Sequence, residues 1–367
     1  MPNEYLPWII AGVVALVVVV SWLLISRARA NPTSPLGRHR PRPHRRHFRS
    51  GEEPETPPKR AAVVVNPTKF IDLALIKDRI TQVCLSEGWG EPLFYETTIE
   101  DPGRGQAEQA VRDGAQVVCS LGGDGTVRAV ASGLVGTQTP LGILPAGTGN
   151  LLARNLDLPV DSFDTAVRVA LTGRNRRIDV GELLVGDTDA DGEPVGTRQS
   201  HYFLILAGIG LDAAIVGDTS EDLKKRVGWP AYMLSGLKNL VSPEFRATIK
   251  LDTEPEFKRR ARGVMIGNTG RLVAGLVLMP NALVDDGVLD VVIASPKGVV
   301  GWVPVATRIV TRQRKGHPTL DQKTCEEVRV RTDRPLHVQV DGDVVGEATE
   351  ITAIVRKATL TVRVSKT

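Results

Sequence analysis

Cysteine is scarce in this chain, whose 367 residues include only Cys84, Cys119 and Cys325, far apart in the sequence. An odd and scattered set excludes a disulfide framework and shows no spacing typical of a metal site, as expected in a reducing compartment. Net charge is small as well, since 46 Lys and Arg nearly balance 42 Asp and Glu. The folded body therefore needs no nucleic-acid partner, and none is expected.

Charge is absent from residues 7–25, a hydrophobic run with Trp8 and Trp22 near its ends. A helix of this length spans roughly 28 Å, close to the thickness of a bilayer core. A cleaved signal peptide is the alternative, but it needs basic residues before the run, whereas here Arg27 and Arg29 follow it. The sequence favours a single transmembrane helix within residues 1–26, with the body on the cytoplasmic side of the cell membrane.

Residues 27–60 lack apolar periodicity and are rich in proline, arginine and histidine, with ten Lys or Arg against three Glu. This composition predicts a disordered basic tether. Attraction to an anionic membrane surface, on the order of 1 kcal/mol per basic residue, is one role for it. A topology signal and spacer is the other, and both stay open. The remaining residues suffice for about two domains.

Short apolar runs alternate with segments of helical spacing from residue 61 to residue 155. This alternation predicts an α/β domain with a parallel sheet between layers of helices. Asn66, Thr98, Gly122 and Thr148 each follow a predicted strand. Because ligands bind at the carboxyl ends of parallel strands, we expect these residues to converge at one edge of the sheet.

Two glycine loops follow neighbouring predicted strands, GGDGT at residues 122–126 and PAGTGN at residues 145–150. Glycine lets backbone amides approach a phosphate closely, and a helix N-terminus favours the negative charge there. Asp124 adds a carboxylate that could handle a metal or a hydroxyl proton. One such loop is weak support, but two in tandem predict a nucleotide site.

Beyond residue 180 the apolar runs are short, β-rich and separated by turn residues, apart from helical stretches at 229–240 and 299–312. This pattern predicts an antiparallel sandwich. We therefore expect an α/β domain over residues 61–180 and a β-sandwich over residues 181–367, whose last segment can return to the first domain.

Further motifs follow the glycine loops in a fixed order. The full set comprises Asn66-Pro67-Thr68, Thr97-Thr98, both glycine loops, GIGLDA at 208–213, PNALVDDGVLD at 280–290, and Asp341-Gly342-Asp343. In these motifs the chain, from about residue 61 to its C-terminus, resembles the diacylglycerol kinase catalytic superfamily, in its bacterial lipid kinase branch, related to sphingosine and ceramide kinases. NAD kinase shares the GGDGT loop, but the later motifs fit the lipid kinases better.

The resemblance implies a Rossmann-like nucleotide domain and a lipid-binding β-sandwich domain, with ATP bound between them. It implies an ATP-dependent lipid kinase that phosphorylates a hydroxyl of a diacylglycerol-like or sphingoid lipid in the bilayer. The nucleotide-binding residues it implies are Asn66, Pro67, Thr68, Thr98, Gly122, Gly123, Asp124, Gly125, Thr126, Val127, Arg128, Gly147, Thr148 and Asn150. It also implies a structural Mg²⁺ held by the Asp286 side chain with backbone oxygens of Leu283 and Val288, since this cation prefers oxygen ligands.

The general base of the family is the last residue of an Asp-Gly-Glu motif, and here that position is the shorter Asp343. Asp124 would orient the metal or share the base role, so the choice between the two carboxylates stays open. The chain also departs from the family at Lys69 and Phe70, larger residues that make the loop after Asn66-Pro67 less open. A glycine run of the family before the metal motif is shortened here and is followed by Leu276.

Two other functions remain open. A kinase of the NAD kinase type would phosphorylate NAD without vesicles, and a non-catalytic lipid-binding relic would transfer no phosphate. The sequence does not identify the acceptor lipid. It leaves the oligomeric state open as well, and a homodimer is compatible with it.

Overall fold

The structure is a computed structural model that describes residues 59–189, 194–210, 243–272, 277–295 and 320–366. The predicted membrane anchor, the tether up to residue 58 and the predicted helices at 229–240 and 299–312 lie outside these ranges. Within them, no helix is both long enough and apolar enough to cross a membrane. The anchor therefore stays a prediction. Pro57–Thr367 forms one compact unit.

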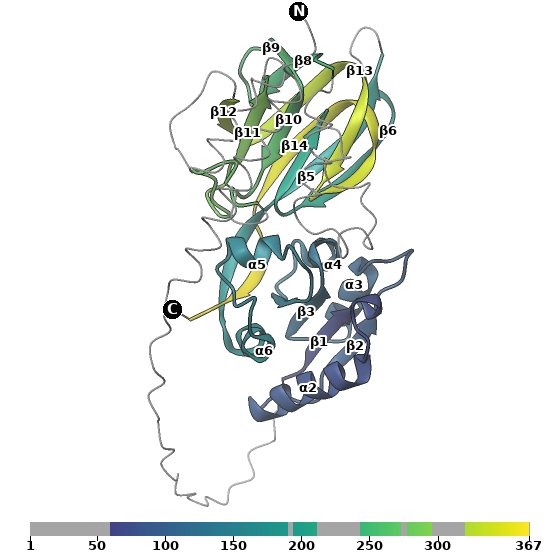
Figure 1. Cartoon of the computed structure of the whole chain (residues 1–367), viewed down its shortest axis with the longest axis vertical. Coiled ribbons are helices and arrows are strands. Elements are labelled where there is room, and N and C mark those ends of the chain that lie inside the picture. The colour runs from purple at the N-terminus through teal and green to yellow at the C-terminus, as the bar shows by residue number, and fades with distance from the viewer. Residues whose placement is uncertain (1–58, 190–193, 211–242, 273–276, 296–319, 367) are drawn as a thin grey trace, which may run out of the picture. The chain divides into compact units, whose positions relative to one another are not determined.

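Four parallel strands form the sheet of the α/β part, in the order β2, β1, β3 and β4 (Figure 1). Val63 in the middle of β1 lies opposite Phe94 on one neighbour and Cys119 on the other. Every residue of β1 and β3 is buried. Such continuous burial is typical of parallel strands covered on both faces. The bounds are β1 Ala61–Val65, β2 Leu93–Glu96, β3 Val117–Gly122 and β4 Leu141–Pro145.

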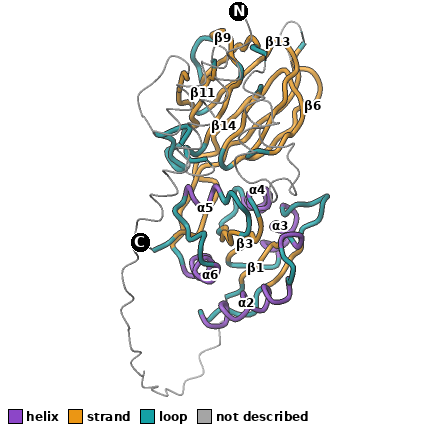
Figure 2. Tube along the Cα trace, viewed as in Figure 1, coloured by secondary structure: helices purple, strands orange, loops and turns teal. Residues whose placement is uncertain are grey.

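Helices cover both faces of this sheet (Figure 2). Ala62 and Val64 pack with side chains of α3, α4 and α5, whereas Val63 packs with α2 and α6. Successive strand residues point to opposite faces, so the two clusters are separate cores. The helices are α2 Leu73–Ser86, α3 Arg104–Arg112, α4 Asp124–Leu134, α5 Leu151–Asn155 and α6 Phe163–Thr172. The predicted three-layer α/β arrangement is confirmed.

The later strands build a β-sandwich around a second core that includes Phe203, Phe245 and Val340 (Figure 2). Their pairs are antiparallel, and β13 lies between β7, β8 and β14. The predicted sandwich is therefore confirmed. Its strands are β5 Arg174–Thr188, β6 Pro194–Phe203, β7 Leu206–Ile209, β8 Phe245–Leu251, β9 Phe257–Ala261, β10 Gly263–Gly267, β11 Leu289–Ala294, β12 Leu320–Cys325, β13 Glu327–Val340 and β14 Asp343–Val364.

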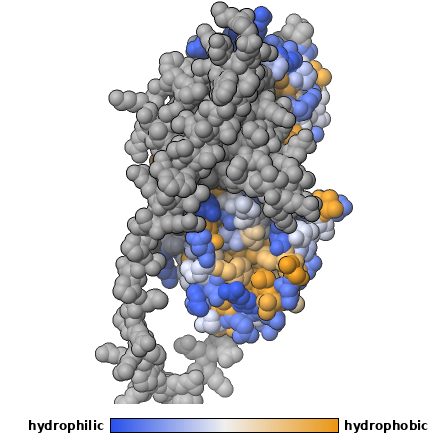
Figure 3. All heavy atoms as spheres, viewed as in Figure 1, coloured by the Kyte–Doolittle hydropathy of each residue, from blue (hydrophilic) through white to orange (hydrophobic). Residues whose placement is uncertain are grey.

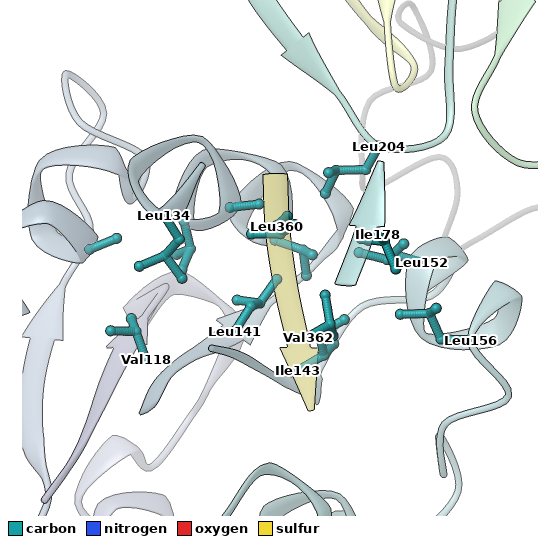
Figure 4. Packing of buried hydrophobic residues seen from close by; sticks show 14 of the residues in the cluster. Val118, Leu134, Leu141, Ile143, Leu152, Leu156, Ile178, Leu204, Leu360 and Val362 are labelled. Carbon is teal, nitrogen blue, oxygen red and sulfur yellow. The ribbon is translucent and has the colours of Figure 1, made fainter. Parts of the chain in front are cut away.

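The C-terminal end of β14 runs from the sandwich into the α/β core. Val362 pairs with Leu141 of β4 in parallel, and Leu360 and Val362 are fully buried. Figure 4 shows both side chains between Leu141 and Ile178. β5 pairs with β14 from Arg174 to Gly186, and both strands contribute side chains to both cores. The division at residue 180 stays a prediction, because β5 continues across it.

The described surface of the α/β part carries hydrophobic residues singly or in small groups among hydrophilic ones (Figure 3). Scattered apolar side chains of this kind are normal on a folded protein.

Candidate active site

The loop after β1 is folded tightly against the end of β3. Oδ1 of Asn66 accepts hydrogen bonds from the backbone amide (3.1 Å) and the hydroxyl (2.7 Å) of Thr68. The amide of Asn66 donates to the carbonyl of Leu121 at 3.0 Å. Asn66 thus caps the 3-10 turn η2 (Pro67–Lys69) and fixes it beside the GGDGT loop.

A second loop follows β2 at the same edge of the sheet. The amide of Thr97 donates to the carbonyl of Val65 at 2.9 Å, which joins this loop to the end of β1. The Thr98 hydroxyl accepts a hydrogen bond from the Asp101 amide at 3.1 Å. The predicted residues after β1 and β2 therefore lie side by side.

The two glycine loops pack directly on each other. The amide of Ala146 donates to the carbonyl of Gly122 at 3.1 Å. A Cβ on Gly147 would lie 2.8 Å from the Cα of Gly123, so a larger residue would push the loops apart. Absence of side chains here keeps the backbone amides of both loops within reach of one ligand.

Asp124 joins the first glycine loop to the second. Its Oδ1 accepts a hydrogen bond of 2.6 Å from the amide of Leu151, the first residue of α5. Burial raises the pKa of the Asp124 carboxyl, although the amides of Leu151 and Asn150 act in the opposite direction. Asn150 is in the left-handed conformation at φ 47° and exchanges hydrogen bonds with Gly147. This carboxylate therefore sets the shape of the second loop.

Other predicted nucleotide contacts differ in exposure. Thr148 and Gly125 are exposed at the loops, whereas Thr126 and Val127 are buried, and Val127 packs into the core with Val130 of α4. A buried side chain cannot touch a nucleotide, so Thr126 and Val127 can contribute only through their backbone.

Asp343 approaches the first glycine loop from the start of β14, directly after the turn that joins β13 to β14. Its Oδ2 lies 2.7 Å from Nη2 of Arg128 in α4 and 3.6 Å from the position of a Cβ on Gly125. Arg128 also donates to the carbonyl of Val340. A carboxylate of the sandwich thus lies over the N-terminus of α4, where a phosphate would bind.

Asp341, two residues earlier, holds that turn in place. Its carboxylate accepts hydrogen bonds from the amides of Leu204 (3.0 Å), Ile205 (2.9 Å) and Leu206 (2.9 Å). Burial raises the pKa of the Asp341 carboxyl, while these amides and Arg128 act to lower it. Asp341 lies in the predicted Asp-Gly-Asp motif, but no role was predicted for it from the sequence. The sequence signal that could have identified it is the pair of carboxylates, Asp341 and Asp343, on either side of Gly342.

The predicted metal ligands lie in the turn that precedes β11. The amide of Val288 donates to Oδ1 of Asp286 at 3.3 Å. Asp179 fixes the turn, since its Oδ2 accepts from the Gly287 amide at 2.7 Å and its own amide donates to the Val284 carbonyl at 2.7 Å. Burial, and secondly the nearby carboxylate of Asp179, raise the pKa of the Asp286 carboxyl.

A cation fits this turn by its chemistry, because a partly desolvated carboxylate among backbone carbonyls offers the oxygen ligands that Mg²⁺ prefers. Within the described ranges, no group of three or more His, Cys, Asp or Glu side chains could hold a metal. The predicted set instead combines one carboxylate with the carbonyls of Leu283 and Val288. Hydrogen bonds of the described residues join this turn to Asp179 and, through Asp285, to Arg176, both in β5.

Protein-family comparisons agree with this architecture. The model of the diacylglycerol kinase catalytic domain matches residues 60–183. The model of the YegS C-terminal NAD kinase beta sandwich-like domain matches residues 205–363. Together they cover both parts described above.

Individual relatives point the same way. A diacylglycerol kinase of Staphylococcus saprophyticus is 26% identical over 293 residues, which are 79% of this chain and 90% of that protein. A Pseudomonas aeruginosa protein named "Probable lipid kinase YegS-like" is 34% identical over 219 residues, 58% of this chain and 66% of that protein. The crystal structure of a Bacillus anthracis diacylglycerol kinase superposes with a TM-score of 0.61 at 19% identity, over 84% of this chain and 98% of that one, and supports the fold.

Proposed function

Because the chain belongs to the bacterial diacylglycerol kinase-like family of lipid kinases, which are ATP-dependent phosphotransferases, we propose that it phosphorylates a hydroxyl of a diacylglycerol-like or sphingoid lipid. The observation that carries this proposal is the position of Asp343. Its carboxylate lies beside Arg128 and over Gly125, so an acid of the sandwich reaches the predicted phosphate loop. An acceptor hydroxyl placed there would meet both a proton acceptor and the phosphate.

In the proposed reaction the lipid oxygen attacks the γ-phosphorus of ATP, and the bond from that phosphorus to the oxygen bridging to the β-phosphate breaks. The hydroxyl proton passes to the carboxylate of Asp343, and ADP leaves with the electron pair of the broken bond. A positioned base of this kind contributes roughly 10²–10⁴-fold to a rate. Amides around Gly123 and Gly125 stabilise charge on the phosphates.

Asp124 has a different part in this proposal. Its carboxylate accepts from the Leu151 amide, so it orders the second glycine loop and thereby the place of the triphosphate. The alternative that Asp124 orients a metal or shares the base role stays a prediction. The turn with Leu283, Asp286 and Val288 would hold Mg²⁺, which would neutralise carboxylate charge and stiffen the turn.

We further propose that the hydrophobic N-terminal run anchors the enzyme in the cell membrane, with its body on the cytoplasmic side. A substrate insoluble in water would then be met in the plane of the bilayer. The basic tether would add attraction to anionic headgroups.

The test is transfer of labelled phosphate from ATP by the full chain. Vesicles containing diacylglycerol, a sphingoid base, ceramide or a phosphoglycerolipid are compared with NAD in solution. We expect label in one lipid product, none in NAD, and loss of turnover in Asp343→Asn. Label in NAD alone would assign the NAD kinase type. Bound ATP without transfer to any acceptor would indicate the lipid-binding relic.

A further inference from the structure

One sheet face of the sandwich is strongly basic. The core-facing residues of β8 are Phe245, Ala247, Ile249 and Leu251, so the residues between them point outward. Strands β9 and β13 contribute to the same outward face through their pairing with β8. We call this surface the outer basic face, and its cations are Arg246, Lys250, Lys258, Arg260, Arg329 and Arg331.

Like charges face each other directly across this surface. Arg246 pairs with Arg260 between β8 and β9, and Lys250 pairs with Arg329 between β8 and β13. Directly opposed like charges destabilise an antiparallel sheet. The arrangement therefore opposes folding, and a role outside folding is the simpler reason for it.

Three acids on or beside this face are already engaged, whereas Glu327 of β13 is exposed beside Arg329. Glu350 is buried and pairs with Arg198 and Arg329. The carboxylate of Glu256 binds Arg331 at 2.7 and 2.8 Å. Asp252 accepts hydrogen bonds from two backbone amides at 2.9 Å. On this face four cations are exposed and have no ionic or hydrogen-bond partner among the described residues: Arg246, Lys250, Lys258 and Arg260.

A small polar cavity lies among these cations. It has a volume of about 170 Å³ and is lined by Lys250, Asp252, Glu327 and Arg329. This is room for several water molecules, and hence for one phosphate group. The carboxylates of Asp252 and Glu327 offset the charges of Lys250 and Arg329 in this cavity, so the net positive charge of the face comes from its other cations.

We propose that the outer basic face docks on an anionic lipid surface through the headgroup phosphates. The choice of a lipid surface as the docking partner rests on the proposed function, because a lipid kinase must reach its acceptor in the bilayer. A planar array of cations matches a planar array of headgroups. Single-stranded nucleic acid needs aromatic side chains for base stacking, and the aromatic ring of β9, Phe257, packs toward the core beneath Arg259.

The experiment is lysine footprinting of the full chain in phosphatidylcholine vesicles with or without phosphatidylglycerol. We expect acylation of Lys250 and Lys258 to slow about fivefold or more in the anionic vesicles, since each cation near such a surface contributes about that factor. High salt should reverse the effect. Lys77, on α2 and bonded to Glu96 at 2.7 Å, is the internal control. Equal rates in both vesicles would overturn the proposal, as would equal protection by inorganic phosphate or by an oligonucleotide.

A variant separates this proposal from the proposed function. Thr replaces Arg246, Lys250, Lys258 and Arg260 together, and a control variant of equal charge change carries Gln at Arg79, Arg104, Arg112 and Arg168 on the α/β helices. We expect the first variant alone to lose the stimulation of lipid phosphorylation by phosphatidylglycerol, with turnover in neutral detergent micelles unchanged. Unchanged stimulation overturns the docking face. If the wild type shows no turnover in micelles, the proposed lipid kinase function is wrong. The acylation rates of Lys250 and Lys258 still test the docking face in that case.

Discussion

Nη2 of Arg128 lies 2.7 Å from Oδ2 of Asp343, so a side chain of α4 holds the carboxylate at the start of β14. Arg128 is 19% exposed, and its guanidinium also donates to the Val340 carbonyl. Arg128 is also one of the predicted nucleotide-binding residues. The structure adds a second role, in which it fixes a short Asp where the family has the longer Glu.

Arg128→Met should lower kcat by about 10²-fold with a small change in KM for ATP, because a misplaced base loses roughly that factor. Asp343→Asn should lower kcat by roughly 10²–10⁴-fold. The double variant should be no slower than Asp343→Asn, because both act through one carboxylate. Steady-state kinetics of the three variants measure this. A rise in KM for ATP with unchanged kcat in Arg128→Met would instead assign Arg128 to phosphate binding.

Gly125→Ala should give a stable protein with reduced activity. The added Cβ would meet only Oδ2 of Asp343, at 3.6 Å, and Ala is favoured over Gly in a helix by about 1 kcal/mol. The same methyl group would occupy the space between the loop amides and the carboxylate. Thermal unfolding should show an unchanged or higher Tm while kcat/KM falls about tenfold or more.

Gly133→Ala, in the same helix, is the matched control. Its Cβ would lie 2.6 Å from the carbonyl oxygen of Arg104, so this variant should lose stability. Full activity in Gly125→Ala would show that the space above the loop is not used by the reactants.

The sequence predicted the part of the site that depends on local pattern. Asn66, Thr98 and the two glycine loops follow strands, and parallel topology alone brings strand ends to one edge. The role of Asp341 depends on amides far away in the chain, at Leu204 to Leu206, which no local pattern reveals.

Contacts between distant parts of the chain also shape the fold in ways that local sequence patterns do not predict. The short apolar runs at 353–355 and 360–364 belong to one long strand, β14, with a register shift between Arg356 and Leu360 and a left-handed Ala358 at φ 50°. The apolar pattern is interrupted at Arg356 and Lys357, as at a strand end, so the sequence separates what the structure joins. Leu360 and Val362 complete the α/β core only because β14 pairs with β5 and β4.

Asp124→Asn should weaken ATP binding more than it slows the chemical step. The carboxylate accepts from the Leu151 amide at 2.6 Å, and a Cβ on Gly149 would lie 2.5 Å from its Oδ2, so it is enclosed by the second glycine loop. An amide in its place presents one acceptor fewer to this loop. We expect KM for ATP to rise by roughly 10- to 100-fold, for the loss of one charged hydrogen bond of roughly 1.5–3 kcal/mol. A large fall in kcat with unchanged KM would support the shared base role.

Asp341→Ala should be strongly destabilising. It removes the acceptor of the amides of Leu204, Ile205 and Leu206, and an unsatisfied buried donor costs about 1–3 kcal/mol. The residue also has φ 49°, which Ala adopts poorly. Thermal unfolding should show a fall in Tm of about 10 °C or more, given that 1 kcal/mol shifts Tm by roughly 2–4 °C in a protein of this size. A shift of only a degree or two would mean that water replaces the carboxylate.

Asp341→Asn tests the charge of the same group, since Asn tolerates the left-handed conformation. Burial raises the pKa of the Asp341 carboxyl, so the folded protein takes up this proton at a higher pH than the unfolded chain, whose carboxyl titrates near an ordinary value of about 3.9. As pH falls through the folded pKa, the wild type therefore gains stability from this group, whereas the Asn variant does not. The Tm of the wild type minus that of the variant should increase from neutral toward mildly acidic pH. A difference that shrinks over this range would mean that the three amides outweigh burial and hold the pKa of Asp341 below its usual value.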